Sequence, residues 1–461
     1  MNARKVNIKC FGCQMNKLDS TLVASALGRA GFAISGNVEN ADIVLINTCS
    51  VRRHAEQRVF SHLGHLKHIK QKRPELIVGV IGCMAQRLGV ELFEHKAVDI
   101  VCGSTQIPKI PELINKALGK QCQSLAVTEQ IRKPDNKNDK ALDDFESAYS
   151  TAQQNLSSQA FVRIMRGCNK FCSYCVVPYV RGPEVSRNPK TIVEQAKRLS
   201  AQGVKQITLL GQAVNCYKYA TCGKMYCLAD VLYEISKISG IEWVKFITSY
   251  PTDIFYDQIL QAMAGLTKVC NYLHMPAQCG SDKMLKAMNR KYSVNKYLEL
   301  IERAKERVPG IEIAGDFIVG YPEESEEIFA GSVSLVKKVR YKNIFVFKYS
   351  PRPGTKAEKY AQDDISQEVK RRRNMELLAV QEEISGHLAG EFLGKTVRVL
   401  VEGPSKKAHL EAENKDNHYQ LVGRTAEDWI VVFGGTKELA GEFVDVKITK
   451  TSPLTLFGEL T

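Results

Sequence analysis

Three cysteines lie close together in a run directly after a strand that is predicted at residues 161–164. They are Cys168, Cys172 and Cys175. Three thiolates on one loop can hold three corners of a cubic 4Fe-4S cluster, which leaves one iron open to a small molecule. Structural zinc is the alternative, but zinc usually takes four protein ligands and the neighbouring sequence offers no fourth. The spacing therefore predicts a redox cluster with an open coordination position.

A second set of cysteines is spread over the first part of the chain: Cys13, Cys49 and Cys83. Each ends a run that is predicted to be a buried strand, at residues 6–13, 41–49 and 76–83. In an open parallel sheet the carboxyl ends of the strands share one edge, so three thiols distant in sequence meet there. Two other interpretations stay open. Buried cysteines are often inert, and Cys10 with Cys13 has the C-x-x-C spacing of a redox pair.

The composition describes a globular protein with several cores. Of 461 residues, 44% are hydrophobic and 8% aromatic, which excludes a mainly disordered chain and predicts two or three domains. The net charge of +14 favours contact with a polyanion, because Lys and Arg release counterions from phosphates. No signal peptide and no apolar run of ~18 residues is present, so a cytoplasmic location without membrane contact is expected. In that compartment 14 cysteines indicate metal or cluster binding in preference to disulfides.

The pattern of apolar residues predicts an α/β protein with three structured regions. Residues 1–126 alternate strand and helix, with helices around 20–30 and 55–72, as in a doubly wound parallel sheet. Residues 127–157 lose this periodicity and are expected to be a linker. Residues 158–384 resume the βα rhythm and predict a full or partial βα barrel, with strands at 161–164, 206–210, 244–247, 311–314 and 343–347. Residues 385–454 predict a small β-barrel, with strands at 396–401, 429–433 and 443–448.

The cysteine motifs resemble those of a known family. The run from Cys168 to Cys175 resembles the cluster motif of the radical S-adenosylmethionine (SAM) superfamily, in which SAM binds the open iron. GCQMN (residues 12–16), NTCSVR (47–52) and GCMAQ (82–86) are similar to the N-terminal motifs of the methylthiotransferases. The resemblance covers nearly the whole chain, including a C-terminal region similar to the RNA-binding TRAM barrel. Residues 175–187 and 349–355 are most similar to the branch that acts on N6-dimethylallyladenosine in tRNA.

This resemblance implies an enzyme that adds a methylthio group to carbon 2 of N6-dimethylallyladenosine, next to the tRNA anticodon. The cluster on Cys168, Cys172 and Cys175 would cleave SAM to a 5′-deoxyadenosyl radical. A radical is required because the adenine carbon bears no acidic proton. Cys13, Cys49 and Cys83 would hold a second, auxiliary 4Fe-4S cluster that supplies sulfur, and a second SAM would supply the methyl group.

Polar residues at the ends of the predicted barrel strands are candidates for binding SAM, because a βα barrel builds its site there. Tyr174, flanked by two cluster ligands, is expected to pack against the adenine of the cofactor. The complete candidate set is Tyr174, Gln212, Asn215, Ser249, His274, Gln278 and Asp316. For each of them an ordinary turn residue is the alternative interpretation.

Four residues beside the cluster loop are candidates for binding RNA: Arg166, Tyr179, Arg181 and Arg187. The arginines would bind phosphates, and Tyr179 would stack an unpaired base. A solvated basic face is the alternative. Residues 385–450 hold 9 Lys+Arg against 10 Asp+Glu. The C-terminal barrel is therefore expected to orient RNA by shape and a few contacts.

Other activities remain open at this point. The first is methylthiolation of threonylcarbamoyladenosine in tRNA, the second is methylthiolation of a ribosomal-protein aspartate, and the third is a non-catalytic iron-sulfur RNA sensor. The expected partners of a monomeric enzyme are a tRNA anticodon stem-loop, an electron donor and a supplier of sulfur or clusters. Two interpretations exist for Cys216, Cys222 and Cys227: they hold a further metal, or they are incidental thiols in a loop. The second is preferred, because no His or acidic cluster completes a ligand set.

Overall fold

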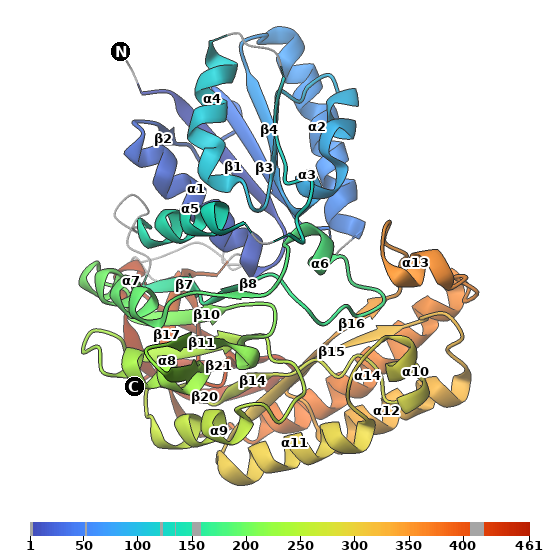
Figure 1. Ribbon diagram of the computed structural model, residues 1–461. Coiled ribbons are helices and arrows are strands. Elements are labelled where there is room, and N and C mark those ends of the chain that lie inside the picture. The colour runs from blue at the N-terminus through green and yellow to red at the C-terminus, as the bar shows by residue number, and fades with distance from the viewer. Residues whose placement is uncertain (1–2, 51–52, 120–122, 134, 150–157, 406–418) are drawn as a thin grey trace.

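The N-terminal part of the chain is a six-stranded parallel sheet. The computed structural model describes residues 3–50, 53–119, 123–133, 135–149, 158–405 and 419–461 (Figure 1). The strand order is β2-β1-β3-β4-β5-β6. The strands are β1 (Lys5–Phe11), β2 (Ala33–Ile34), β3 (Ile43–Thr48), β4 (Ile77–Gly82), β5 (Ile100–Gly103) and β6 (Ser124–Ala126). The predicted doubly wound sheet is confirmed, and the short strands β2, β5 and β6 complete it.

Helices cover both faces of this sheet, because successive residues of each strand point to opposite sides. Leu45 packs in the core under α1 (Gln14–Arg29) and α4 (Ile110–Leu118). Its neighbours Val44 and Ile46 pack in the core under α2 (Arg53–Lys72) and α3 (Cys83–Leu88). The predicted helices correspond to α1 and α2.

The segment that was expected to be a linker contains a helix. Helix α5 (Asn136–Ser147) begins where the Asp135 side chain accepts a hydrogen bond from the backbone N–H of Asn138. Its Leu142 joins the core of the N-terminal domain and its Glu146 is buried. The helix escaped sequence analysis because most of its surface is polar, and its two apolar contacts, Leu142 and Phe145, are too few to make a periodic pattern.

The central part is an open arrangement of parallel strands in two halves. One half has the order β13-β10-β7 and the other β14-β15-β16. The strands are β7 (Gln159–Arg163), β10 (Gln206–Leu210), β13 (Trp243–Ile247), β14 (Tyr272–His274), β15 (Glu312–Val319) and β16 (Asn343–Lys348). An isolated bridge between Val244 and Val269 and a hydrogen bond from Ser249 N–H to the His274 carbonyl join the halves. The sequence predicted strands at β7, β10, β13, β15 and β16 but did not include β14 among them, and the predicted barrel is a partial one.

Helices cover the outer side of these strands, and their apolar faces complete the largest core of the molecule. They are α7 (Pro189–Ala201), α8 (Leu228–Ser236), α9 (Tyr256–Gly265), α10 (Asp282–Ala287), α11 (Val294–Arg307) and α12 (Glu326–Val339). Short elements connect the strands at the inner edge: β8 (Met165–Arg166), α6 (Val177–Val180), β9 (Val185–Ser186), β11 (Lys218–Thr221), β12 (Lys224–Cys227) and α13 (Lys356–Tyr360).

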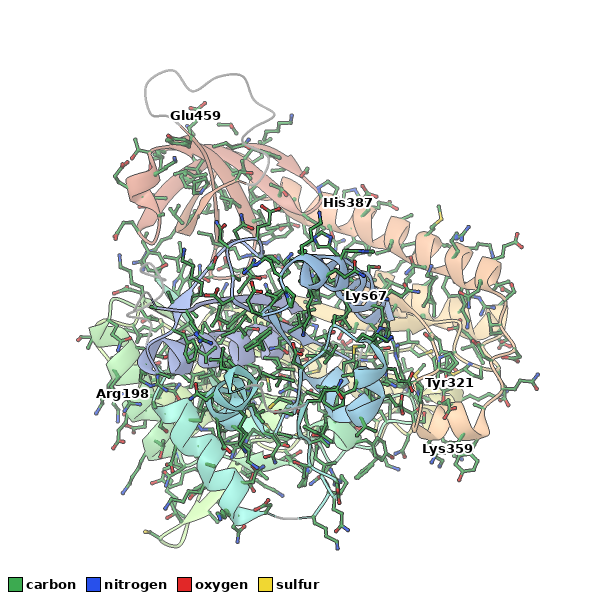
Figure 2. The ribbon with its side chains drawn as sticks, turned by 90° about the horizontal axis from the view of Figure 1, so that it is seen from above. Lys67, Arg198, Tyr321, Lys359, His387 and Glu459 are labelled. Atoms are coloured by element: carbon green, nitrogen blue, oxygen red, sulfur yellow. The ribbon has the colours of Figure 1, made fainter. Side chains whose placement is uncertain are left out.

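The C-terminal part is a closed five-stranded barrel in the order β17-β18-β19-β21-β20. Its strands are β17 (Thr396–Pro404), β18 (Tyr419–Arg424), β19 (Ile430–Gly435), β20 (Phe443–Ser452) and β21 (Thr455–Leu460). The last strand, β21, lies wholly beyond the expected boundary at residue 454. Helix α14 (Gln367–Gly390) leads into the barrel, with His387 near the junction (Figure 2). Within the described residues, no helix has both the length and the apolar character that crossing a membrane requires.

A buried ion network ties the N-terminal sheet to the central strands. Asp19 of α1 has no exposed side-chain surface and contacts two guanidinium groups. Arg163 of β7 donates to Oδ1 of Asp19, and Arg181 donates to Oδ2 at 2.7 Å. Glu146 of α5 accepts from Arg163 at 2.8 Å and lies 3.2 Å from Arg187. Burial alone would raise the pKa of Asp19, but the two arginines outweigh it and hold that pKa below its ordinary value.

This network makes Asp19 a test of how the two parts are joined. We expect Asp19→Asn to lower the free energy of unfolding by about 3–5 kcal/mol, because two buried arginines lose their common carboxylate. Urea unfolding followed by circular dichroism measures the change. The control is Glu112→Gln, which breaks an exposed pair with Lys116 and should leave the free energy of unfolding almost unchanged. Equal losses in the two variants would contradict a joining role for Asp19.

Candidate functional site

The loop that carries the first three cysteines is anchored at its start and in its middle. These cysteines, called the loop cysteines below, are Cys168, Cys172 and Cys175. Gly167 opens the loop at φ +67°, and a Cβ there would lie 1.8 Å from the carbonyl oxygen of Pro183, so only glycine fits. Ser173 donates its backbone N–H to the Met288 carbonyl at 3.0 Å. The loop is therefore fixed against the turn that follows helix α10.

The loop cysteines lie within electrostatic reach of one another. Burial raises the pKa of the Cys168 and Cys175 thiols, and Cys172 adds to both shifts. In the described part of the chain, no three Cys, His, Asp or Glu side chains converge on the point that a single metal ion would occupy. Three thiolates of a cubic cluster bind three different irons and need not converge in that way. The arrangement suits a cluster better than one zinc ion.

Arg290 supplies a positive charge to the loop cysteines. Its Nη1 donates to the Sγ atom of Cys172 at 3.3 Å, and its Nη2 donates to the Pro276 carbonyl at 3.1 Å. The guanidinium group lies 4.6 Å from the ring centre of Tyr250 and 5.0 Å from that of Tyr292. No carboxylate among the described residues forms a salt bridge with it. Sequence analysis missed Arg290, because no local pattern brings it to the loop.

Three of the predicted SAM-binding residues form a polar group on neighbouring strands. His274, on β14, lies between the Thr248 hydroxyl (2.6 Å to Nδ1) and Asp316 of β15 (3.3 Å from Nε2 to Oδ1). Ser249 follows β13, and its buried Oγ has no hydrogen-bond partner in the described structure. A buried hydroxyl without a partner needs an explanation, and a polar ligand provides one. This edge of the strands therefore fits a polar cofactor.

The other predicted SAM-binding residues differ in what they can offer. Asn215 is buried, and both ends of its amide bind the backbone of Tyr250 at 2.7 Å, so it braces that segment. Gln212 is half-buried in the turn after β10. Gln278 adopts φ +70° and donates its backbone N–H to the Asp316 carbonyl. Tyr174 packs against an apolar cluster beside the loop. Of these four residues, Asn215 is the one whose side-chain amide is already occupied by hydrogen bonds within the described structure.

The second set of cysteines meets at the edge of the N-terminal sheet. These strand-end cysteines are Cys13, Cys49 and Cys83. The last residues of β1, β3 and β4 lie side by side, with Phe11 opposite Thr48 and Thr48 opposite Gly82. A hydrogen bond with Cys49 and the charge of Arg181 together lower the pKa of Cys13 to about 5, against the effect of burial. Parallel register thus brings together thiols that are far apart in sequence.

Two asparagines, which sequence analysis quoted only within motifs, brace this edge. The Cys13 thiol donates to Oδ1 of Asn16 at 3.3 Å, and Nδ2 of Asn16 donates to Oδ1 of Asn47 at 2.9 Å. A Cβ on Gly82, which adopts φ +93°, would lie 2.4 Å from that Asn47 oxygen. The position of each asparagine, within three residues of a strand-end cysteine, was the available signal.

One short helix separates the two cysteine sets. Helix α6 begins two residues after Cys175, and its Val180 packs with Val176 against Cys83. Directly after the helix, Arg181 donates from Nε to the Sγ atom of Cys83 at 3.2 Å. Figure 1 shows α6 at the junction of the N-terminal sheet and the central strands. Helix α6 therefore connects the loop cysteines to the sheet edge that holds the strand-end cysteines.

The structure does not support an RNA-binding role for the three candidate arginines, because each is buried and paired. Arg166 lies 3.0 Å from Asp143, and Arg187 lies 3.2 Å from Glu146. Arg181 binds Asp19 and Cys83, as described above. Their carboxylate partners come from α1 and α5, so no sequence neighbour revealed them. Tyr179 differs: it is exposed and lies edge-on to the ring of Phe171, with centroids 6.2 Å apart.

The remaining cysteines do not form a third site among the described residues. The segment with Cys216, Cys222 and Cys227 is a hairpin of β11 and β12 where a loop was expected. Cys222 is exposed at its turn, whereas Cys216 and Cys227 are buried, and Cys227 caps helix α8. Cys10 lies on β1, where burial raises the pKa of its thiol.

Comparison with known proteins identifies the family. Residues 5–103 match the model described as "Uncharacterized protein family UPF0004", residues 162–336 the radical SAM superfamily and residues 390–461 the TRAM domain. The chain is 41% identical to the tRNA-2-methylthio-N(6)-dimethylallyladenosine synthase of Rhodopirellula baltica, over 99% of this chain and 95% of that protein. The synthase of the same name from Syntrophomonas wolfei is also 41% identical, over 99% and 97%. This chain belongs to that synthase family.

Membership of this family makes the chain a radical SAM methylthiotransferase. The radical SAM superfamily implies a 4Fe-4S cluster and SAM, and the loop cysteines with their open polar edge fit both. A solved radical SAM methyltransferase, TsrM from Kitasatospora setae, has the same general fold, with a TM-score of 0.51, 14% identity and 77% coverage of each chain. We propose that the loop cysteines hold this 4Fe-4S cluster, so that the surroundings of Cys172 affect how readily the cluster accepts an electron.

Arg290 is therefore a residue to test by electrochemistry. Replacement by methionine removes a positive charge and a hydrogen bond to a ligand sulfur, both of which favour the reduced cluster. A charged hydrogen bond worth roughly 1.5 kcal/mol corresponds to about 60 mV for one electron, so Arg290→Met should shift the midpoint potential by about that much to more negative values. Redox titration followed by electron paramagnetic resonance measures it.

Arg290→Lys is the matched control, because it keeps the charge but not the planar donor geometry. Its potential should lie between those of wild type and Arg290→Met. A methionine variant that binds its full complement of iron and has an unchanged potential would rule out this electrostatic role.

Proposed function

We propose that this chain adds a methylthio group to carbon 2 of N6-dimethylallyladenosine, the nucleoside beside the anticodon of tRNA. The synthases to which it is similar over nearly their whole length carry this reaction in their names. The single observation that carries the proposal is the placement of two cysteine sets on either side of α6. Radical formation and sulfur donation then act on one substrate atom between them.

The strand-end cysteines are proposed to hold an auxiliary 4Fe-4S cluster. Their thiols meet in a buried setting, and Arg181 provides a positive charge at 3.2 Å from Cys83. Asp19 neutralises part of that charge at 2.7 Å. When bound, the two clusters and SAM supply a 5′-deoxyadenosyl radical, sulfur and a methyl group. The residues of the chain have to hold these groups, orient the base and exclude water.

The SAM molecule at the loop cysteines is proposed to bind Ser249, His274, Gln278 and Asp316, with Tyr174 and Gln212 at the border of the site. Ser249 offers a buried hydroxyl, and Asp316 offers a carboxylate that is only partly exposed. The backbone of Gln278 is fixed at positive φ by Asp316. Carboxylate and hydroxyl groups suit the hydroxyls of a ribose or the ammonium of a methionine.

The base itself is proposed to leave its stack and lie near Tyr179. Chemistry on a ring carbon requires access that a stacked base does not give. Tyr179 is 42% exposed and lies on α6, the helix between the two cysteine sets. Stacking on an aromatic ring is worth about 1–3 kcal/mol per base. A tRNA anticodon stem-loop is accordingly the proposed partner of this face.

Two cysteine variants separate the two proposed clusters. Cys172→Ala should abolish the formation of 5′-deoxyadenosine, because the radical is generated there. Cys49→Ala should preserve 5′-deoxyadenosine and abolish the methylthio product, because sulfur is supplied from the other set. The assay is anaerobic: reconstituted protein, SAM, dithionite and a stem-loop with N6-dimethylallyladenosine, followed by nucleoside mass spectrometry.

Cys222→Ala is the control, since this exposed thiol lies at the turn of a hairpin and should leave both products unchanged. Methylthio product from Cys49→Ala would show that the auxiliary-cluster proposal is wrong. A wild-type protein that forms 5′-deoxyadenosine but modifies only threonylcarbamoyladenosine would show that the proposed substrate is wrong. With no 5′-deoxyadenosine from any reconstituted sample, the radical reaction itself would fail.

A further inference from the structure

Helix α2 presents an exposed face with an excess of positive charge. From Arg53 to Lys72 it contains five Lys+Arg against one acidic residue, together with four of the nine histidines of the chain. The side chains of Arg58, Lys67 and Lys72 are exposed, whereas Val59, Leu63 and Leu66 face the sheet. The helix is therefore amphipathic, with a cationic outer face.

The positive charges of this face are not neutralised by nearby acids. Glu56, the one acidic residue of α2, pairs with Arg87, and Asp99 pairs with Lys70. Within the residues that the structure describes, Arg58, Lys67 and Lys72 form no salt bridge. Free cations on one face of a helix act together on a polyanion, whereas isolated surface ion pairs contribute little.

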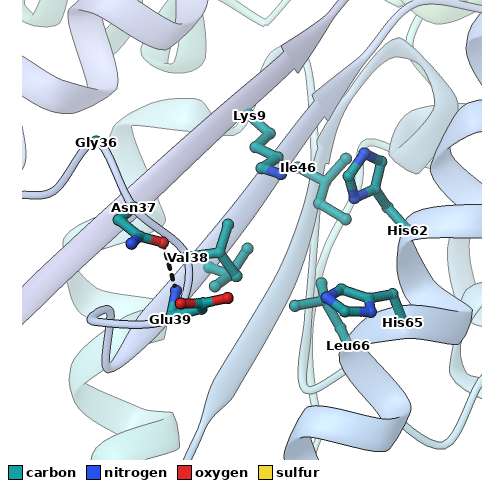
Figure 3. Close-up of a pocket in the computed structure, with 10 residues that line it drawn as sticks. Lys9, Gly36, Asn37, Val38, Glu39, Ile46, His62, His65 and Leu66 are labelled. Atoms are coloured by element: carbon teal, nitrogen blue, oxygen red, sulfur yellow. Dashed lines mark hydrogen bonds between the residues drawn. The ribbon is translucent and has the colours of Figure 1, made fainter.

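A cavity of about 270 Å³ opens beside α2 and adds further basic groups (Figure 3). Its lining includes Lys9 of β1 and His62 and His65 of α2, with one acidic residue, Glu39, over an apolar floor that includes Ile46. The cavity lies between α2 and the loop that joins β2 to β3, which contributes Gly36 and Asn37. Burial, then the charges of Lys9 and His65, lower the pKa of His62.

The position of α2 connects this basic face with the reaction site. The helix begins four residues after Cys49, one of the strand-end cysteines, and runs away from them for 20 residues, or about 30 Å. That length spans several phosphates of a double-stranded stem. By contrast, the C-terminal barrel is nearly neutral over the residues counted above. The basic excess of the chain is thus concentrated in part on α2.

We infer that the outer face of α2 and the adjoining cavity bind the phosphate backbone of the tRNA stem while the anticodon loop reaches the cysteines. This inference rests on the proposed function. The face is cationic and polar, as nucleic-acid interfaces are. Interfaces with proteins are depleted of lysine and have an apolar core, so an acidic protein partner fits this face less well.

The test compares two triple variants with the same change in charge. The first is Arg58→Gln, Lys67→Gln and Lys72→Gln on α2. The control is Arg307→Gln, Lys337→Gln and Lys338→Gln, three residues with exposed side chains. They belong to α11 and α12, which lie at the end of the molecule opposite to α2 (Figure 1). The dissociation constant of tRNA containing N6-dimethylallyladenosine is measured for each protein over a range of salt concentrations.

The α2 variant should bind tRNA roughly tenfold or more weakly at low salt, and the slope of log K against log salt should decrease by about two to three. The control variant should keep the affinity and the slope of wild type. Unfolding midpoints and the visible absorbance of the reconstituted clusters check that both variants fold. A folded α2 variant with the wild-type slope, or the same loss in the control, would overturn the inference.

The outcome for wild type separates this inference from the proposed function. In one outcome, the wild-type protein makes the methylthio nucleoside while the α2 variant binds tRNA normally. That result would support the proposed function and contradict the binding surface on α2. An α2 variant that binds tRNA normally but accepts electrons slowly from a protein donor would also overturn the inference and assign the face to that donor. A wild type that neither binds nor modifies tRNA would remove the proposed function and this inference together.

Discussion

The arrangement of the two cysteine sets depends on the buried ion pairs that the carboxylate of Asp19 forms with two arginines. The carboxylate lies between Arg163, which belongs to the first strand of the central part, and Arg181, which follows helix α6. Because Arg181 also donates to Cys83, this one carboxylate fixes the distance between the sheet edge and the helix that leads back to Cys175. A buried charge pair is costly unless its geometry is well satisfied, so it imposes one orientation on the parts that it joins.

The two cysteine sets are alike in having an arginine beside one cysteine, and they differ in whether a carboxylate balances that arginine. Each has one arginine that donates to a cysteine sulfur, Arg290 to Cys172 and Arg181 to Cys83. Asp19 balances Arg181, whereas aromatic rings and a backbone carbonyl surround Arg290. A positive charge without a carboxylate beside it favours an added electron more strongly than a neutralised one. The loop cysteines therefore have the environment that suits electron uptake.

The basic residues of the chain fall into two groups that the sequence alone does not distinguish. Arg166 and Arg187 are close to the cluster loop in sequence, but they are buried and pair with Asp143 and Glu146 of α5. These arginines hold the loop in place. Lys67 and Lys72, far from the loop in sequence, are exposed on α2. Burial, and not proximity in the chain, decides which positive charges remain for a polyanion.

The sequence by itself determined the parts that local patterns encode. Alternating apolar runs placed the parallel strands, and the spacing of the loop cysteines predicted their cluster, because both signals lie within a few residues. Strand ends also predicted that Cys13, Cys49 and Cys83 meet. Only the tertiary structure showed that α5 contributes Glu146 to the buried ion network and that Arg290 and Arg181 donate to cysteine sulfurs. It also showed that Asn215 binds the backbone of Tyr250. The partners of these residues are distant in the chain, and a polar side chain shows no periodicity from which its burial and its ion pairs can be read.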